Sequence, residues 1–418
     1  MNLHVSFPRD IRPRRVSAFR TVVVAAVLVA GVTAARAAEL PLPPPPGIPV
    51  LRIDTDGAAP IVSRRQYARG SVSLAANGGV DSTGRPMAGL ATTPIRVRGR
   101  GNTSWEHPKK PWRLKFDNAT DILGMGAAKT WVLLANYVDP SGLRNATAFE
   151  LGRRLGMPFT PEARHVNLVL NGEFQGLYLL TEQTEVAPHR VVTDTVDGFL
   201  VEFDDYPDPD EEIFSTQILD LPLKIKRPDL AELPPTARAE AVARITGIFN
   251  AFERTITAAD GPGDYAAILD VDSIIDWFLV HEITHNYEPR HPKSCFFHLA
   301  VDGRIAAGPL WDFDWSFDHE DLEPNVLLLK NVAWFPHLFK DPGFTAKVKA
   351  RWTAIRDGPA ASLPAYVDGL VAAIGDSVEH DMRLWPGDDD YRLTPEGPGL
   401  AAWLKQRIAL LDEAIEKL

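Results

Sequence analysis

Residues 272–317 constrain the fold of this 418-residue chain more than any other stretch. The stretch begins with apolar residues at helical spacing, which predicts a helix: Ile274, Ile275, Phe278, Leu279 and Ile283. After a polar loop, two short strands are expected at Cys295–Leu299 and 304–307, because Asp302 and Gly303 between them favour a tight hairpin. The segment that directly follows the second strand carries two acids among three aromatic residues: Trp311, Asp312, Phe313, Asp314 and Trp315.

We call residues 311–315 the acid turn. Asp312 and Asp314 are two residues apart, so on an extended segment their side chains project to the same side. Taking a carboxylate out of water costs several kcal/mol unless a cation or hydrogen-bond donors compensate. Two oxygen ligands on one side suit Mg²⁺ or Mn²⁺, especially if phosphate oxygens complete the coordination shell. The alternative is that both acids cap turns or pair with arginines.

The first 37 residues are typical of an export signal. A basic region precedes an apolar run at 21–35, and Ala35, Arg36 and Ala37 then form a small-x-small cleavage site. We therefore predict that residues 1–37 are a signal peptide and that the protein is exported, to the periplasm or out of the cell. An uncleaved membrane anchor is the alternative, but the apolar run is shorter than the ~20 residues that a spanning helix needs. The mature chain is accordingly expected to hold no transmembrane segment.

The charge of the mature chain limits the classes of partner. Residues 1–37 contain six arginines and one acid, so their removal leaves 38 basic and 54 acidic side chains and a formal net charge of −16. A chain this acidic is not expected to bind nucleic acid or an anionic membrane. Cys295 is the single cysteine of the sequence, so no internal disulfide can form and the fold must depend on its core. Residues 38–50 are predicted to be a stiff, proline-rich linker.

Short strands are expected after the linker, at 51–54, 61–64, 67–74 and 94–99, because glycine, asparagine and aspartate turns separate them. The last of these strands runs into the residues that we call the glycine turn: Arg98, Gly99, Arg100, Gly101 and Asn102. Glycines let backbone amides approach an anion closely, and the two arginines add positive charge. The glycine turn is therefore a candidate phosphate site, with an ordinary arginine-rich turn as the alternative.

Residues 111–116 alternate between apolar and basic side chains, which predicts a strand with two distinct faces. The apolar face must point into the core and carries Trp112, Leu114 and Phe116. The other face must point to solvent or into a cleft and carries Arg113 and Lys115.

The remaining patterns predict a helix at 143–156, a hairpin at Asn171 and Gly172, and a mostly helical region at 318–418. Residues 204–212 form an acidic run, which is expected to be a solvated loop, with calcium binding as the alternative.

The segment GPLWDFDWSF at 308–317, with EITHN upstream at 282–286, resembles the spore coat protein H (CotH) kinase family of secreted atypical kinases. Other segments agree with that family in its own order: RGRGNTSW and KKPWRLKF within 98–116, WVLLANYVDPSGLRNATAFELGRRLG at 131–156, LNGEFQGLYLLTEQTE at 170–185 and GFLVEF at 198–203. The resemblance covers the chain from about Leu51 to its C-terminus. It is specific as a set and weak for any single segment.

The resemblance implies an α+β, two-lobed atypical protein kinase-like fold with a helical C-terminal region. The kinase-like domain would span 51–418, with a β-rich lobe at about 51–203 and a helical lobe at about 204–418. The implied activity is the metal-dependent transfer of phosphate from ATP to a Ser or Thr of a protein substrate, with Mg²⁺ or Mn²⁺ as the ion.

The resemblance also assigns roles to residues at matching positions. Asp312 and Asp314 would hold the metal. Lys115 would be the strand lysine that binds the nucleotide phosphates, with Lys110 as second choice and Glu150 as the partner of Lys115. The implied ATP-binding set is Arg98, Arg100, Asn102, Lys110, Lys115 and Glu150.

On the acceptor side, the implied catalytic residues are Asn286 and Glu288. The family usually has an aspartate shortly after the asparagine of its EltkN motif, whereas here Asn286 is followed by Tyr287 and Glu288. Glu288 could still accept the proton of an acceptor hydroxyl, with one methylene more of reach. One cleft is expected to be lined by Lys115, Asn286, Asp312 and Asp314.

Two alternatives to the kinase remain. The departure at Glu288 is compatible with a catalytically inactive kinase-like protein that serves as a secreted binding or envelope-assembly protein. A metal-dependent hydrolase that uses the same carboxylates is the other.

Overall fold

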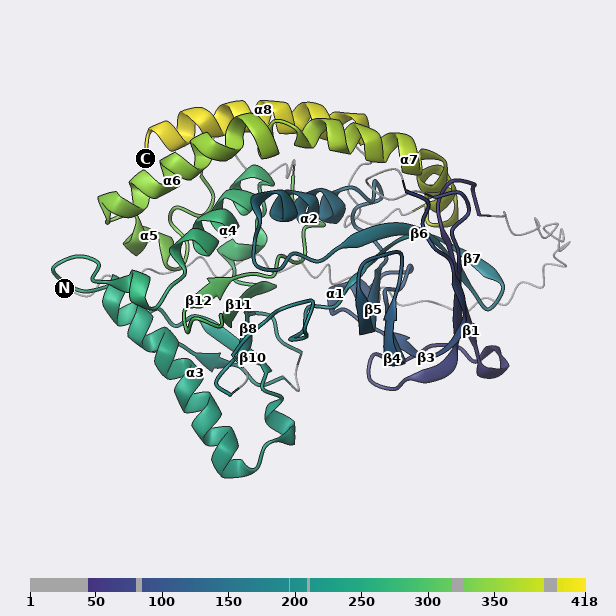
Figure 1. Ribbon diagram of the computed structural model, residues 1–418, viewed down its shortest axis with the longest axis horizontal. Coiled ribbons are helices and arrows are strands. Elements are labelled where there is room, and N and C mark those ends of the chain that lie inside the picture. Colours follow the sequence, from purple (N-terminus) through teal and green to yellow (C-terminus); the bar gives the residue numbers. More distant parts are fainter. Residues whose placement is uncertain (1–43, 80–84, 195, 209–210, 318–326, 387–396) are drawn as a thin grey trace, which may run out of the picture. The chain divides into compact units, whose positions relative to one another are not determined.

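The computed structural model describes residues 44–418 except 80–84, 195, 209–210, 318–326 and 387–396 (Figure 1). The predicted signal peptide at 1–37 and the start of the predicted linker at 38–50 lie outside the described residues. Two sheets and a set of helices make up the part that is described. Among its helices, none combines the length and the apolar character needed to cross a membrane.

Seven strands close into a barrel in the order β1-β2-β3-β4-β5-β7-β6. Neighbouring strands are antiparallel, except that β1 and β6 pair in parallel and so close the barrel. The strands are β1 (Val50–Thr55), β2 (Ala68–Ala75), β3 (Leu90–Gly99), β4 (Trp112–Asp121), β5 (Ala127–Leu134), β6 (Ala163–Leu170) and β7 (Glu173–Glu182).

The barrel is filled by its own apolar core. On β4 the predicted alternation is confirmed, because Trp112, Leu114 and Phe116 are buried in that core. Arg113 and Lys115 lie between them on the outer face and are half-buried.

A second sheet of five strands has the order β12-β11-β8-β10-β9. Its strands are β8 (Leu200–Phe203), β9 (Phe214–Ser215), β10 (Pro222–Arg227), β11 (Cys295–Leu299) and β12 (Ile305–Ala307). The hairpin expected at Asp302 and Gly303 is confirmed, since β11 and β12 are antiparallel neighbours. Because β8 pairs with β11, the acidic run that follows β8 is brought close to the residues that precede β11.

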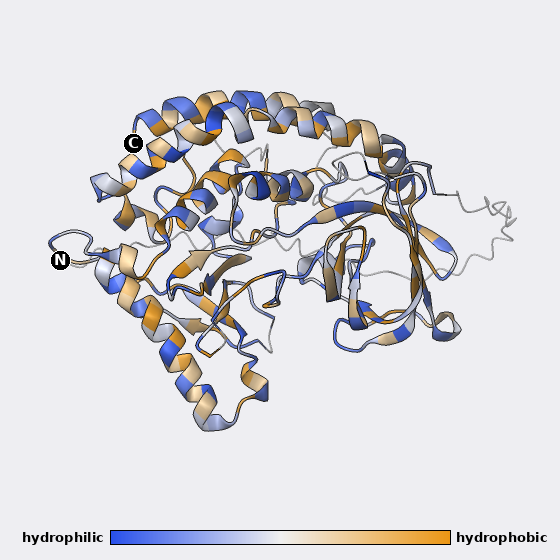
Figure 2. Cartoon of the chain, in the orientation of Figure 1, coloured by the Kyte–Doolittle hydropathy of each residue, from blue (hydrophilic) through white to orange (hydrophobic). Residues whose placement is uncertain are grey.

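The helix α4 (Val271–Ile283) confirms the helix predicted at the start of the central stretch, and it packs against α2, α6, α8 and β12. Figure 1 shows α7 and α8 running side by side above α2 and α4. Figure 2 shows apolar and polar residues mixed along α3 and α8, as in helices with one buried side. The other helices are α1 (Thr103–Glu106), α2 (Arg144–Leu155), α3 (Pro235–Ile256), α5 (Phe335–Leu338), α6 (Pro342–Ile355), α7 (Leu363–Leu384) and α8 (Gly397–Glu416).

The expectation of an α+β, two-lobed kinase-like fold is wrong, although the expected helical C-terminal region is confirmed by α5, α6, α7 and α8. The N-terminal strands close into a seven-stranded barrel, and a separate five-stranded sheet lies beyond them in the chain. The physical reason is the parallel pairing of β1 with β6, which joins the two edges that an open sheet would leave free. Residues 61–64, which were expected to be a strand, are also not one.

Candidate functional site

The acid turn brings its two carboxylates together through a bend. Asp312 has a φ of +66°, in the left-handed region, so the extended segment expected from the i and i+2 spacing is not what forms. Burial, the charge of Asp312 and a side-chain hydrogen bond with Asp312 raise the pKa of Asp314 well above its usual range. The two acids are thus neighbours that cannot both hold a negative charge cheaply unless a cation is present.

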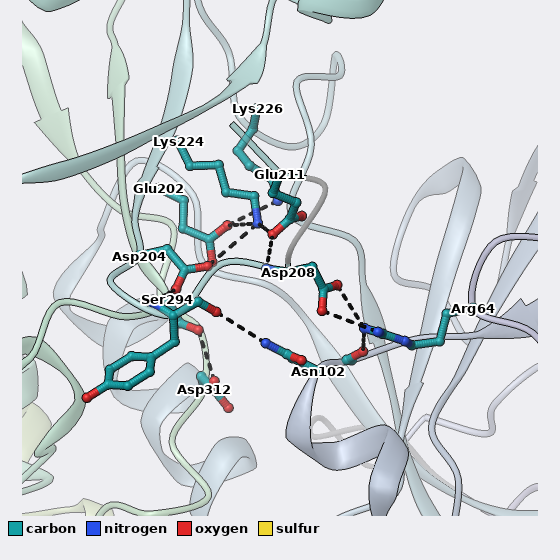
Figure 3. Close-up of polar contacts among 12 residues, drawn as sticks. Arg64, Asn102, Glu202, Asp204, Asp208, Glu211, Lys224, Lys226, Ser294 and Asp312 are labelled. Atoms are coloured by element: carbon teal, nitrogen blue, oxygen red, sulfur yellow. Dashed lines mark hydrogen bonds and ion pairs between the residues drawn. The ribbon is translucent and has the colours of Figure 1, made fainter. Parts of the chain in front are cut away.

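Glu288 and Ser294 lie beside the acid turn. The hydroxyl of Ser294 donates a hydrogen bond to Oδ2 of Asp312 at 2.9 Å (Figure 3). Glu288, in a short 3₁₀ helix at Glu288–Arg290, is 6% exposed, and its pKa is raised by burial and by the charge of Asp312. Its Oε2 atom is buried without a hydrogen-bond partner in the described part of the chain. Glu288 therefore adds a third acid, with a free oxygen, to the surroundings of Asp312.

Asn286 follows the end of α4 and is fully buried. Its Oδ1 atom accepts a hydrogen bond from the backbone N–H of Glu288 at 3.1 Å, which holds the start of the 3₁₀ helix. Its Nδ2 atom has no hydrogen-bond partner among the residues that the structure describes. Because a buried donor without a partner is costly, the Asn286 amide is suited to donate to a ligand oxygen.

The glycine turn brings Arg100 to the acid turn. The guanidinium carbon of Arg100 lies 5.4 Å from the ring centroid of Trp311. Burial lowers the pKa of Arg100 to about 10, although the charges of Asp312, Glu202 and Asp314 oppose that change. The glycine turn, expected to bind phosphate, and the acid turn, expected to bind a metal, thus lie next to each other at Arg100.

The two glycines of the glycine turn are required by a close contact at Gly99 and by the backbone conformation at Gly101. A Cβ atom on Gly99 would lie 2.2 Å from the ring of Trp105. Gly101 has a φ of +84°, which a residue with a side chain seldom adopts.

The other predicted ATP-binding residues of this region have contacts of their own. The guanidinium of Arg98 lies 5.1 Å from the ring centroid of Tyr67. The Asn102 amide donates to the carbonyl of Tyr206 at 3.2 Å, and Nζ of Lys110 donates to the carbonyl of Trp105 at 2.6 Å.

Lys115 and Glu150 do not form the expected pair. Glu150 instead binds Arg153 and Arg154, with nitrogen–oxygen distances of 2.8 Å each. Lys115 lies on the outer face of β4, where its neighbours across the sheet are Arg96 and Thr130. Within the described ranges, no hydrogen bond or ion pair joins Lys115 to the acid turn, so its place in the same cleft stays a prediction.

One residue of the acidic run differs from the expectation of a solvated loop. Asp204, at its start, is 7% exposed, so it is buried and not part of a solvated loop. Nζ of Lys224, on β10, lies 3.6 Å from Asp204 and 3.8 Å from Glu202, and it also pairs with Glu211 (Figure 3). The available signal was that the run begins at the end of a predicted strand.

Two contacts tie the glycine turn to the acidic run (Figure 3). One is the bond from Asn102 to the carbonyl of Tyr206. The other runs through Arg64, which donates to the carbonyl of Gly101 at 2.7 Å and pairs with Asp208 at 2.8 Å. These contacts hold the glycine turn close to the end of β8.

Lys293 was also missed, because a lysine in a polar loop carries no pattern. Burial would lower its pKa, but the charges of Asp312, Glu288, Asp314 and Asp204 raise it. Lys293 therefore supplies a positive charge to the same group of acids.

The residues present fit a metal that arrives with phosphate. Among the described residues, no group of three or more His, Cys, Asp or Glu side chains is arranged to hold a metal ion. Mg²⁺, however, is commonly held by only one or two carboxylates, with phosphate oxygens and water completing its shell. Asp312 and Asp314 provide that number, and their mutual repulsion would be relieved by such an ion.

One known protein family matches this chain. Residues 95–411 match the model of a family described as CotH kinase protein. The matched range contains the glycine turn, α2, Asn286 and the acid turn. No curated protein matches the chain.

Proposed function

We propose, since the chain belongs to the family of CotH kinase proteins, that it is an exported, metal-dependent phosphotransferase that moves the γ-phosphoryl group of ATP to a Ser or Thr of a protein. One observation carries the proposal: Arg100 of the glycine turn lies beside the paired carboxylates of the acid turn. A cation that can bind phosphate next to acids that can bind a metal is the combination that phosphoryl transfer needs.

On the nucleotide side, Arg100 is proposed to bind the phosphate oxygens. Its guanidinium presents several N–H donors in one plane, which matches phosphate geometry. Further ATP contacts are proposed for Arg98, Asn102, Lys110 and Lys115. Asn102 and Lys110 would have to exchange their present backbone carbonyl partners for the nucleotide. Asp312 and Asp314 are proposed to hold the ion, which when bound neutralises negative charge on the phosphates.

On the acceptor side, Glu288 is proposed as the general base. The acceptor oxygen forms a bond to the γ-phosphorus as its proton passes to Glu288. The bond from that phosphorus to the β–γ bridging oxygen breaks, and ADP leaves. Burial and Asp312 raise the pKa of Glu288, and a raised pKa makes a carboxylate a stronger base. The Asn286 amide is proposed to donate to the acceptor oxygen or to a phosphate oxygen.

The test is the transfer of radiolabel from γ-labelled ATP to the protein itself or to casein, with Mg²⁺ or Mn²⁺. We expect transfer by the wild type and its loss in Asp314→Asn and Glu288→Gln. A wild type that binds ATP but transfers no label would contradict the phosphotransferase and favour the catalytically inactive binding protein.

Export is part of the proposal and has its own test. The signal at 1–37 predicts that the mature protein begins at or near Ala38. N-terminal sequencing of the exported protein measures this directly. A mature form that retains Met1 in the membrane would show that the segment is an anchor.

A further inference from the structure

Asn145, at the start of α2, binds the main chain of the acid turn between its two carboxylates. Oδ1 of Asn145 accepts a hydrogen bond from the backbone N–H of Phe313 at 2.9 Å, and this contact is buried. Phe313 directly follows Asp312, whose backbone is in the left-handed region. Residues other than glycine seldom hold that conformation unless their surroundings fix it. The bond from Asn145 fixes the next peptide unit.

Arg144, the neighbour of Asn145, holds the residues that follow the acid turn. Its guanidinium donates to the carbonyl of Ser316 and, at 2.9 Å, to that of Phe317. Asp139 in turn accepts from the backbone N–H of Arg144 at 2.9 Å and so caps this end of α2. Both side chains at the start of the helix are therefore committed to the acid-turn segment.

The rest of the same helix face packs on that segment. Asn145, Phe149 and Gly152 recur at i, i+4 and i+7 and share one face of α2. The ring of Phe149 lies 6.0 Å from that of Trp311, centroid to centroid. Gly152 leaves room for the side chain of Leu310, because a Cβ atom at position 152 would lie 2.5 Å from Cδ1 of Leu310. Packing places residues 310–313 against α2, and the hydrogen bond that Asn145 accepts from Phe313 selects the backbone conformation of the acid turn.

We propose that Asn145 is a positioning residue for the metal site: its bond to Phe313 keeps Asp312 and Asp314 on one side, ready to bind one ion. This inference rests on the proposed function, because it concerns the same metal site. It differs in naming a side chain that would touch neither the ion nor the nucleotide.

The test compares Asn145→Leu with the wild type. Leucine has a similar size and cannot accept the hydrogen bond. ATP affinity is measured by calorimetry once with Mn²⁺ and once with EDTA, and the ratio of the two affinities is the metal-dependent gain. We expect Asn145→Leu to reduce that gain about ten- to hundredfold, as outer-sphere substitutions at metal sites do, and to leave the affinity in EDTA unchanged.

A matched control lies two residues away on the same helix. Thr147 is fully buried, and its hydroxyl has no hydrogen-bond partner within the residues that the structure describes. Thr147→Val therefore changes a buried polar side chain of α2 without touching the acid turn. Its metal-dependent gain should equal that of the wild type, even if its melting temperature shifts.

Each outcome decides a different point. A wild type without any metal-dependent gain contradicts the proposed function itself. A wild type with the gain, together with an Asn145→Leu protein that keeps it, overturns the role of Asn145 alone. If Asn145→Leu does not fold, Asn145→Ala is measured in the same way. Failure of both to fold would overturn the inference, because Asn145 would then serve the fold and not the site.

Discussion

Inside the barrel the buried residues are apolar, as Val97, Leu114 and Leu133 illustrate, whereas around the acid turn the buried residues include Asn286 and Glu288. Burying apolar area in the barrel stabilises the fold. Burying Asn286 and Glu288 costs stability, because each keeps a polar atom without a partner among the described residues. The difference indicates where function is expected: the barrel interior stabilises the fold, whereas Asn286 and Glu288 beside the acid turn carry a cost in stability that a ligand would remove.

The barrel core should give the largest loss of stability. Leu114→Ala leaves a cavity in the interior and is expected to lower the free energy of unfolding by about 2–5 kcal/mol. Denaturant titration at constant temperature measures the loss. Lys115→Ala, on the outer face of the same strand, is the control and should change the free energy by less than about 0.5 kcal/mol. Equal effects at both positions would contradict the assignment of the two faces.

A substitution in the acid turn should reduce activity and leave stability intact. Asp314→Asn removes a charge that burial and Asp312 disfavour, so the melting temperature should stay the same or rise. Phosphoryl transfer should fall about a hundredfold or more, which is about 2.7 kcal/mol. Asp117→Asn, at a carboxylate that is 77% exposed on the barrel, is the control for charge alone. A large loss of stability in Asp314→Asn would show that the acid serves the fold.

Substitutions of Arg100 and Lys115 test whether ATP binds beside the acid turn or on the outer face of the barrel. Arg100→Met is expected to raise the KM for ATP about tenfold, because it removes a cation beside the acid turn. Lys115→Met should raise the KM only about threefold, since no hydrogen bond or ion pair joins Lys115 to the acid turn among the described residues. Steady-state kinetics with varied ATP gives both values. The reverse order would move the ATP site to the outer face of β4.

The last prediction concerns His281 and the pH dependence of stability. His281 lies on α4 against Trp277 and Phe313, and burial lowers its pKa from 6.5 to about 3. Below about pH 6.5, His281 is therefore protonated in the unfolded chain but stays neutral in the folded chain. The free energy of unfolding should fall as the pH drops from about 6.5 toward 3. Between about pH 7.5 and pH 5.5 the loss should be about 1.4 kcal/mol. His281→Phe should reduce the pH dependence by that amount, and an unchanged slope would show that His281 is not the group responsible.

Local patterns predicted the elements of this fold well. The helix at the start of the central stretch, the hairpin at Asp302 and Gly303, and the two faces of β4 each depend on residues close in sequence. Spacing alone is enough to detect such features. The arrangement of the elements was not predicted. The closure of the barrel depends on the pairing of β1 with β6, and the sequence of neither strand indicates which strand it pairs with.

The candidate site shows the same division. Motifs pointed to Arg100 and Asp312, and the structure brings these two residues together. The partner of Glu150 was wrong, because two arginines on its own helix outcompete a lysine on another element. Asn145 could not be recognised, since its role depends on a bond to the main chain of a residue far along the sequence.

The parallel closure of the barrel also has a consequence for the order of folding. Val50 pairs with Asn167, so the first strand has no partner on one side until most of the N-terminal half has been synthesised. Closing so long a loop costs entropy before any contact offsets it, and pairings that are distant in sequence form slowly. The helices and hairpins should therefore form first and the barrel seam late. This order would suit the proposed export, because a channel that translocates unfolded polypeptides needs a chain whose barrel has not yet closed.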